Sequence, residues 1–313
     1  RKRKITVTVF FWLMILSCTV TGVVGFFAGL CALFTTAFVN LFPNQNPKII
    51  TKAALSKKMS TSNWLFFKNI FEQLLQQYHK ILPHIAQNKL IRLLKNLADV
   101  KAIDSTVVQV CKKLEAIFAS TKEGIATLKI NIRMSLCNNA PDKVGVTEGK
   151  CHDINFKFLE AKKNILYLFD LGYYCHALFD KIISHSCFFV SRLKYAASAT
   201  IIKALDKFSP RNIAGLSLQT VCAKAKHGTL DLLVEIGKAK GTKMSHQVRL
   251  IGILHENVWF FYITNLLDRS LKPRDFFVLY SQRWQIEIFF NQIKTYLNLN
   301  RVCVLNKNSI MVQ

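Results

Sequence analysis

Four side chains near the C-terminal end of the sequence have the types and spacing of a site that holds a metal ion and a phosphodiester together. Arg283, Glu287 and Lys294 follow Tyr280 at offsets of 3, 7 and 14 residues. On one α-helix, these offsets bring all four side chains to nearly one face, which Asn291 shares. The carboxylate suits a divalent cation, and the cations and the phenol suit phosphate oxygens. The alternative is a solvated helix face with an Arg–Glu pair.

The remainder of this segment favours a partly buried helix over a solvated one. Pro273 begins the segment, as proline does at a first helical position. Apolar residues occupy much of the predicted helix circumference: Ile286, Ile288, Phe289, Phe290 and Ile293. We therefore expect one helix that starts at Pro273 and carries Glu287.

Two aspartates upstream lie in strand-like contexts. Asp104 interrupts a β-branched and apolar run, and Asp170 ends the continuous apolar run Ile165–Phe169, which is typical of a buried central strand. Gly172 follows, and the junction of a buried strand with a Gly-containing loop is a common ligand site in α/β sheets. The alternative for each aspartate is a turn or capping role.

These segments together resemble a known family. The Tyr-Arg-Glu-Lys spacing is similar to the signature of bacterial insertion-sequence transposases of the insertion-sequence-four type, a branch of the DDE transposases. Asp104-Ser-Thr resembles the first-aspartate motif of that family, and Phe169-Asp-Leu-Gly-Tyr-Tyr resembles the second. The resemblance runs from about residue 98 to the end and includes three further blocks: Leu128–Arg133, Thr147–Asp153 and Tyr262–Asn265.

The resemblance implies a ribonuclease H-like α/β fold, a mixed sheet flanked by helices, with Asp104, Asp170 and Glu287 as catalytic metal ligands. Three carboxylates that converge from two strands and a helix can hold two divalent cations about 3.5–4 Å apart. Mg²⁺ suits such a site because it accepts carboxylates, phosphate oxygens and water. We expect two Mg²⁺ ions, with Mn²⁺ as a substitute.

The same resemblance implies that Tyr280, Arg283 and Lys294 bind phosphates of the transposon end. Trp284 follows the arginine, as an aromatic residue does in relatives. Trp284 has two open interpretations: it stacks on a base extruded from the duplex, or it is a core residue.

The composition agrees with a polyanionic partner. The chain has 313 residues, with 43 Lys and Arg against 18 Asp and Glu, and a net charge of +25. Such an excess fits DNA or an anionic membrane, and the alternative is a solvated basic surface. Nine cysteines without a Cys-x-x-Cys pair indicate reduced residues of a cytosolic protein. The sequence has no phosphate-binding loop of the ATPase type and no Gly-x-Ser-x-Gly motif.

The first 97 residues are predicted to form a helical N-terminal region, which by resemblance binds DNA. Residues 5–47 carry no charged side chain, and they follow the basic cluster Arg1–Lys4. Residues 5–47 are hydrophobic enough for a membrane span, but we favour a buried helical region because a single span would separate the remainder from DNA. Further helical patterns cover Trp64–Leu75 and Leu90–Leu97.

By the same resemblance, residues 98–313 are predicted to form the catalytic domain, with a β insertion at about 195–270. Three strand candidates support the insertion: Leu230–Ile236, Val248–Leu254 and Val258–Thr264. Basic residues of the insertion are candidate DNA contacts: Lys238, Lys240, Lys243 and Arg249.

The resemblance therefore implies a DNA transposase that cuts at the ends of its own element and joins them to target DNA. Its partners would be double-stranded DNA, both terminal inverted repeats and target, and a second copy in a homodimer. It would act in the bacterial cytoplasm at the nucleoid. The alternatives are a catalytically dead or truncated DNA-binding remnant and a membrane-anchored basic protein. The chain begins without methionine and stops 19 residues after Lys294, so we expect both ends to be cut.

Overall fold

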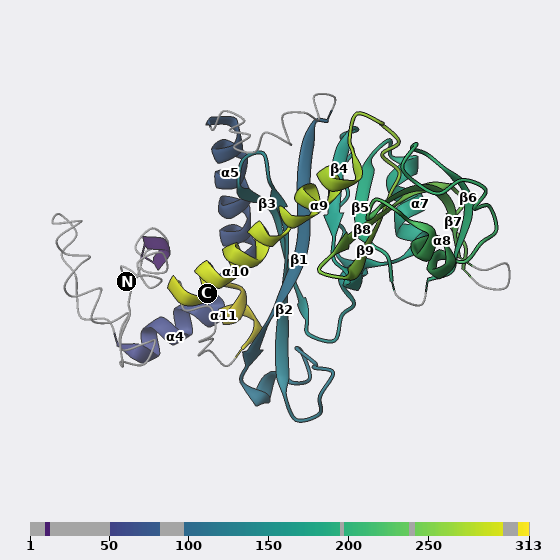
Figure 1. Ribbon diagram of the computed structural model, residues 1–313. Coiled ribbons are helices and arrows are strands. Elements are labelled where there is room, and N and C mark those ends of the chain that lie inside the picture. The colour runs from purple at the N-terminus through teal and green to yellow at the C-terminus, as the bar shows by residue number, and fades with distance from the viewer. Residues whose placement is uncertain are drawn as a thin grey trace.

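A single mixed sheet lies at the centre of the protein, with helices against both faces (Figure 1). Within the described residues, nine strands follow the order β3-β2-β1-β4-β5-β9-β8-β7-β6. The computed structural model describes these ranges: residues 10–12, 51–81, 97–194, 197–237, 242–296 and 306–312.

The strands occupy the following residues, in chain order: β1 Asp99–Val110, β2 Ala126–Ser135, β3 Ala140–Glu148, β4 Ile165–Phe169, β5 Phe188–Arg192, β6 Ala199–Ala204, β7 Thr229–Ile236, β8 Val248–His255 and β9 Val258–Thr264. The helices are α4 Lys52–Thr61, α5 Trp64–Ile81, α7 His176–Ser184, α8 Leu218–Lys224, α9 Pro273–Ser281, α10 Trp284–Tyr296 and α11 Lys307–Val312. Three short 3₁₀ turns complete the description: η1 Lys112–Leu114, η2 Asp153–Asn155 and η3 Leu171–Tyr173.

The sheet has two halves of different topology. In the first half, β1 pairs in parallel with β4, and β4 with β5, whereas β2 and β3 extend this half by antiparallel pairing. In the second half, β9 pairs antiparallel with β5, and β8, β7 and β6 follow as antiparallel neighbours. The second half continues the same sheet, and its last strands, β7 and β6, lie to the right of β5 in Figure 1.

Alternating side chains of β4 explain why this strand is central. Ile165, Tyr167 and Phe169 pack into a core with α7 and α8, while Leu166 and Leu168 pack into a second core with α9 and α10. A strand that is buried on both faces reads as a continuous apolar run, and β4 has the predicted bounds.

Three predicted strands of the second half are also confirmed, since β7, β8 and β9 cover the candidate segments. Three strands were not predicted: β3, β5 and β6. The sequence of β3, Ala-Pro-Asp-Lys-Val-Gly-Val-Thr-Glu, contains residues that are rare in strands. It forms an edge strand, where proline costs no ladder hydrogen bond.

The prediction of one continuous helix from Pro273 through Glu287 is wrong. Pro273 begins α9, which ends at Ser281, and Glu287 belongs to α10. Between them the N–H groups of Gln282 and Arg283 donate to carbonyls three residues back, so the chain tightens into a 3₁₀-like turn. Neither proline nor glycine marks this break.

The N-terminal region is helical where it is described. The predicted Trp64–Leu75 helix is confirmed as part of α5, and His79 connects it to the sheet region by hydrogen bonds with Pro141 O (2.9 Å) and Asn138 Nδ2 (2.8 Å). The predictions for residues 5–47, apart from 10–12, and for Leu90–Leu97, apart from its last residue, lie outside the described residues. No described helix is both long and apolar enough to cross a membrane.

Candidate active site

Asp104 lies in β1, and Asp170 directly follows β4, the neighbouring parallel strand. Ile103 pairs with Phe169 in the β1–β4 register, so the two aspartates follow a paired position in both strands. By strand alternation, Asp104 shares the face of Val100 and Ala102, which pack with the core under α9 and α10. Two sequence segments that are 66 residues apart thus place their carboxylates together on the helix-covered face.

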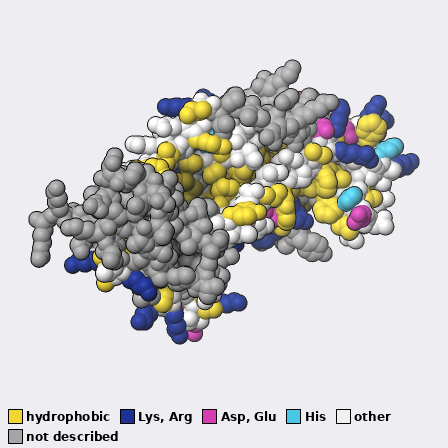
Figure 2. Space-filling view, turned by 90° about the vertical axis from the view of Figure 1, so that its left-hand side faces the viewer, with side chains coloured by type: hydrophobic (Ala, Val, Ile, Leu, Met, Phe, Trp, Pro, Cys, Tyr) yellow, Lys and Arg dark blue, Asp and Glu magenta, His cyan; other side chains and the backbone are white. Residues whose placement is uncertain are grey.

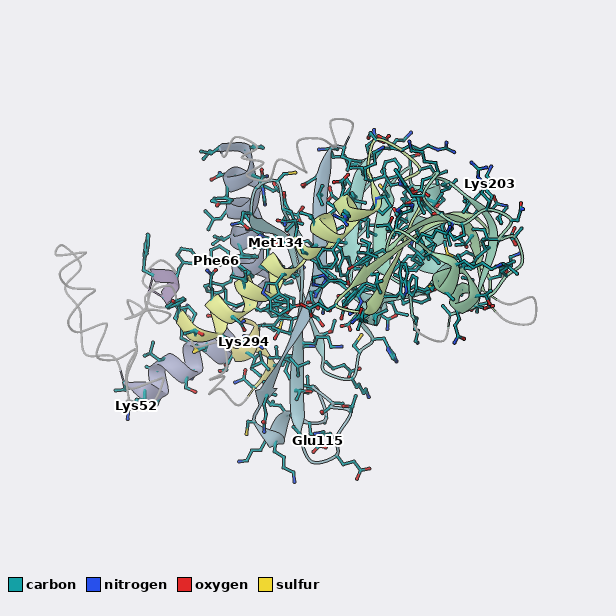
Figure 3. All side chains as sticks on the ribbon, in the orientation of Figure 1. Lys52, Phe66, Glu115, Met134, Lys203 and Lys294 are labelled. Atoms are coloured by element: carbon teal, nitrogen blue, oxygen red, sulfur yellow. The ribbon has the colours of Figure 1, made fainter. Side chains whose placement is uncertain are left out.

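Arg283 joins the strand-borne and helix-borne carboxylates. Its Nη1 donates to Asp104 Oδ2 at 3.2 Å, and its Nη2 donates to Glu287 Oε1. Arg283 and Glu287 therefore keep their predicted i,i+4 contact despite the helix break. Neither side chain is fully exposed to solvent. Figure 3 shows α10 crossing in front of β1, with Lys294 labelled near the far end of the helix.

Burial and charge perturb the ionisation of this cluster. Burial raises the pKa of Asp104 to about 6; the Ser105 N–H and Arg283 oppose this, whereas the carboxylates of Asp170 and Glu287 add to it. Burial disfavours the charge of Arg283, but its bond to Glu287 and the nearby charges raise its pKa overall. Asp170 and Glu287 can raise the pKa of Asp104 only if their carboxylates lie close to it.

The predicted DNA-binding residues have different environments. The Tyr280 hydroxyl donates to Phe169 O at 3.0 Å, and burial raises its pKa to about 12, so this tyrosine fastens α9 to the end of β4. Trp284 is 57% exposed at the start of α10, which makes the core interpretation wrong. Lys294 is half-buried on α10, and it forms no ion pair within the described part of the chain.

Sequence reasoning missed a second group of polar residues beside the carboxylates. Ser105 Oγ donates to Asp153 Oδ1 at 2.7 Å, and Lys129 Nζ lies 3.0 Å from the same oxygen. A Cβ on Gly172 would lie 3.3 Å from Asp153 Oδ2, which places η2 against η3. Only the fold reveals this proximity, because 48 residues separate Ser105 from Asp153 in the sequence.

The side chains around Arg283 suit a hydrated divalent cation by chemical type. The candidate ligands are carboxylates, which hard cations prefer. The Tyr173 hydroxyl is buried without a hydrogen-bond partner, and Asp153, Asp104 and Asp170 all raise its pKa after burial itself. Among the described residues, no three His, Cys, Asp or Glu side chains are arranged to hold a metal ion; in this arrangement the Arg283 guanidinium bridges Asp104 and Glu287.

Two of the basic residues predicted as DNA contacts of the insertion are engaged elsewhere. Arg249 is buried, and its Nε and Nη2 donate to both oxygens of Asp231 at 2.8 and 2.7 Å. The prediction of Arg249 as a DNA contact is therefore wrong. Lys243 Nζ lies 2.7 Å from Glu235, and Lys238 and Lys240 lie outside the described residues.

One family model matches most of the chain. Residues 95–313 match a family model described as a transposase DDE domain. The chain is 22% identical over 306 residues to the transposase for insertion sequence element IS231F of Bacillus thuringiensis subsp. israelensis, covering 84% of this chain and 62% of that protein. A similar solved structure is a piggyBac transposase synaptic complex with hairpin DNA, at 7% identity and a TM-score of 0.43, covering 97% of this chain and 64% of that chain. The chain thus spans less than two thirds of the length of both proteins.

Proposed function

Because this chain belongs to the transposase DDE-domain family, we propose that it is a DNA transposase of the insertion-sequence-four type. It would cut DNA at the ends of its own element and join them to a target. One observation carries this proposal: Arg283 bonds both Asp104 and Glu287, although Asp104 lies 179 residues earlier in the chain. The fold thereby brings the first-aspartate motif into contact with the Tyr-Arg-Glu-Lys motif.

The topology supports a ribonuclease H-like catalytic domain. In the order β3-β2-β1-β4-β5, an antiparallel β1–β3 meander is followed by two strands parallel to β1. Asp104 belongs to the central strand β1, and Asp170 directly follows the central strand β4. Strands β6–β9 extend the sheet beyond β5 as the insertion. The division into residues 1–97 and 98–313, with an insertion at about 195–270, agrees with this arrangement and stays a prediction.

Asp104, Asp170 and Glu287 would hold two Mg²⁺ ions, for which Mn²⁺ would substitute. When bound, these ions would lower the pKa of an attacking water or hydroxyl and stabilise the leaving oxygen. Water would attack phosphorus and release a 3′-hydroxyl; that hydroxyl would then attack a target phosphate and release a target 3′-oxygen. Asp153 and Lys129 would position Ser105, and hence the β1 backbone next to Asp104.

Three exposed or exchangeable side chains would bind the DNA. Arg283 would exchange a carboxylate for a phosphate oxygen, because its planar fork suits both. Lys294 would bind a phosphate farther along α10, and exposed Trp284 would stack on an extruded base. Tyr280 would act at the same phosphates only after leaving Phe169 O, so its proposed role includes fixing α9.

The partners would be the terminal inverted repeats and target DNA, bound by a homodimer that holds two ends at once. The site of action would be the bacterial cytoplasm, at the nucleoid. The net charge of +25 supports a polyanionic partner. On the face shown in Figure 2, Lys and Arg side chains are distributed around the rim and acidic side chains are few.

An excision assay tests the proposal. The reading frame is expressed in trans to a marker flanked by the element's own ends, with Glu287→Gln and Asp104→Asn in parallel. We expect excision with the wild-type chain and none with either variant.

The other outcomes discriminate the alternatives. Excision retained by Glu287→Gln would refute the site assignment. Binding of the inverted repeats without excision by any chain would instead identify a catalytically dead or truncated remnant. A reporter fused after residue 47 that resists alkaline extraction from membranes would support the membrane-anchored alternative.

A further inference from the structure

Two loops of the insertion bring an exposed aromatic ring and several cations together. Phe208 follows β6, and His227 precedes β7; their ring centroids lie 5.5 Å apart. Lys207 Nζ lies 5.3 Å from the centroid of the Phe208 ring, and Lys226 neighbours His227 in the chain. We call Lys207, Phe208, Lys226 and His227 the loop patch.

The loop patch is exposed and nearly free of acidic residues. Phe208 is 50% exposed, and the other three side chains are exposed too. Residues 199–230 contain a single acid, Asp206, and five exposed cations: Lys203, Lys207, Arg211, Lys224 and Lys226. None of these cations forms an ion pair within the described residues, so their charge is available to a partner. Figure 3 labels Lys203 on the insertion, on the opposite side of β1 from Lys294 in that view.

The Phe208 ring gives the loop patch a defined geometry. A cation held over an aromatic face loses less freedom on binding than a lysine that extends into water. The loop itself is fixed to the sheet, since Ser209 Oγ accepts from Asp231 N at 2.9 Å and Leu205 N donates to Asp231 O at 2.8 Å. Lys207 is therefore presented from an anchored loop.

The strand register places the loop patch on the same edge of the sheet as the carboxylates. One row of paired residues runs across six strands: Phe169, Ser191, Ile263, Leu250, Leu232 and Ala204. Asp170 follows the first member of the row, and Leu205 follows the last. β6 runs in the same sense as β4, so both segments leave the sheet at the same edge, although the sheet twists between them. Five strand spacings of about 4.8 Å separate them by about 24 Å along the row.

A separation of this size matches a short length of duplex. At 3.4 Å per base pair, about seven base pairs cover 24 Å. The β8–β9 hairpin leaves the same edge between the two points, and Leu254 N in β8 donates to Gly228 O next to the loop patch at 2.8 Å. His255 of β8 contacts Phe277 of α9, with ring centroids 5.8 Å apart, so an unbroken series of contacts joins the loop patch to the helix pair of the site.

From this arrangement we infer that the loop patch binds phosphates of the DNA about seven base pairs from the cleavage site. The inference rests on the proposed function, since it takes the DNA to be held at Asp104, Asp170 and Glu287. Lys207 and Lys226 contact the backbone, and Phe208 holds Lys207 in place. The contact is independent of sequence, because phosphates carry no base identity.

The test measures binding of a fluorescent 40-base-pair duplex by anisotropy, over a series of salt concentrations. The variant is Lys207→Gln/Lys226→Gln. The matched control is Lys162→Gln/Lys163→Gln, which removes two exposed lysines just before β4, at the opposite end of that strand from Asp170. We expect the loop-patch variant to bind about tenfold more weakly at low salt. Its log–log salt slope should be shallower by about 1.8, which corresponds to two phosphate contacts.

Phe208→Leu provides an independent readout. It keeps an apolar side chain but loses the ring under Lys207, so we expect about threefold weaker binding. A loop-patch variant that binds like the control, with the same salt slope, would overturn the inference and leave the proposed function intact. A wild-type chain that fails to bind any duplex would overturn both.

Discussion

Two arginines of this protein each bind carboxylates, but they do so in different ways. Arg249 of β8 donates to both oxygens of Asp231 and to the backbone carbonyls of Asp268 and Leu271. Its guanidinium also lies 4.9 Å from the centroid of Phe276, and its side chain is 2% exposed. Arg283 divides its Nη atoms between Asp104 and Glu287, and its Nε is buried without a hydrogen-bond partner.

This difference distinguishes a structural ion pair, at Arg249, from a candidate functional site, at Arg283. Each guanidinium nitrogen of Arg249 has a hydrogen-bond partner, and the residue joins the insertion to the segment before α9, so it fixes where the helix pair lies. Arg283 is incompletely bonded, and its two carboxylates remain 22% and 28% exposed. A buried donor without a partner requires a functional or structural explanation. Exchange of Arg283 between carboxylate and phosphate is the explanation that we propose.

The largest expected effect is loss of the carboxylates. Asp104→Asn, Asp170→Asn or Glu287→Gln should lower DNA-end cleavage about a thousandfold or more, because each would remove a proposed ligand of the metal ions and several kcal/mol of transition-state stabilisation. Cleavage of a labelled duplex end by purified chains measures this. Circular dichroism provides the control for folding. Full activity in any one variant would remove that residue from the site.

Replacing Arg249 should affect stability more than chemistry. Arg249→Met would leave Asp231 buried and unpaired, at a cost of about 3–5 kcal/mol of unfolding free energy. Denaturant titration measures the change. The double variant Asp231→Leu/Arg249→Met should recover part of it, since no uncompensated charge remains. A single variant with wild-type stability would show that the two arginines do not differ as we describe.

Arg283→Met should affect chemistry more than stability. Asp104 and Glu287 are partly exposed and can be hydrated, so we expect a stability loss of about 1 kcal/mol or less. End cleavage should fall about a hundredfold, which corresponds to one charge-assisted hydrogen bond to a phosphate. A loss of stability as large as that of Arg249→Met, with cleavage reduced only in proportion to unfolded protein, would make Arg283 a structural residue too.

Trp284→Ala should have the smallest effect of the series. Because the side chain is largely exposed, stability should change by less than about 0.5 kcal/mol. Cleavage should fall about tenfold if the ring stacks on a base. Ile288→Ala, at another exposed apolar position of α10, is the matched control. Equal cleavage by both variants would contradict a stacking role.

The parts of the fold that the sequence predicts are those with strong local signals. The β4 run is apolar throughout because both of its faces are buried, and β7, β8 and β9 are rich in β-branched and aromatic residues. The edge strand β3 lacks such a signal, since pairing with β2 outweighs its Pro, Asp and Gly content.

For the site, too, the sequence predicts only contacts between residues that are close in the chain. Residue types and spacing indicate Arg283 and Glu287 as partners because i,i+4 proximity is local. The burial of Arg249 is not local, since its partners lie at Asp231, Asp268 and Leu271. Asp153 likewise reaches Ser105 only because η2 packs beside η3. The sequence alone therefore does not predict whether a basic residue in a strand faces DNA or a buried carboxylate.

The most direct test of the account is Mn²⁺ binding by the chain in complex with a duplex end, followed by electron paramagnetic resonance. We predict that Glu287→Gln and Asp104→Asn weaken Mn²⁺ binding at least about tenfold, whereas Lys162→Gln/Lys163→Gln binds like the wild type. Unchanged Mn²⁺ binding in both carboxylate variants would contradict the claim that these residues hold the metal ions.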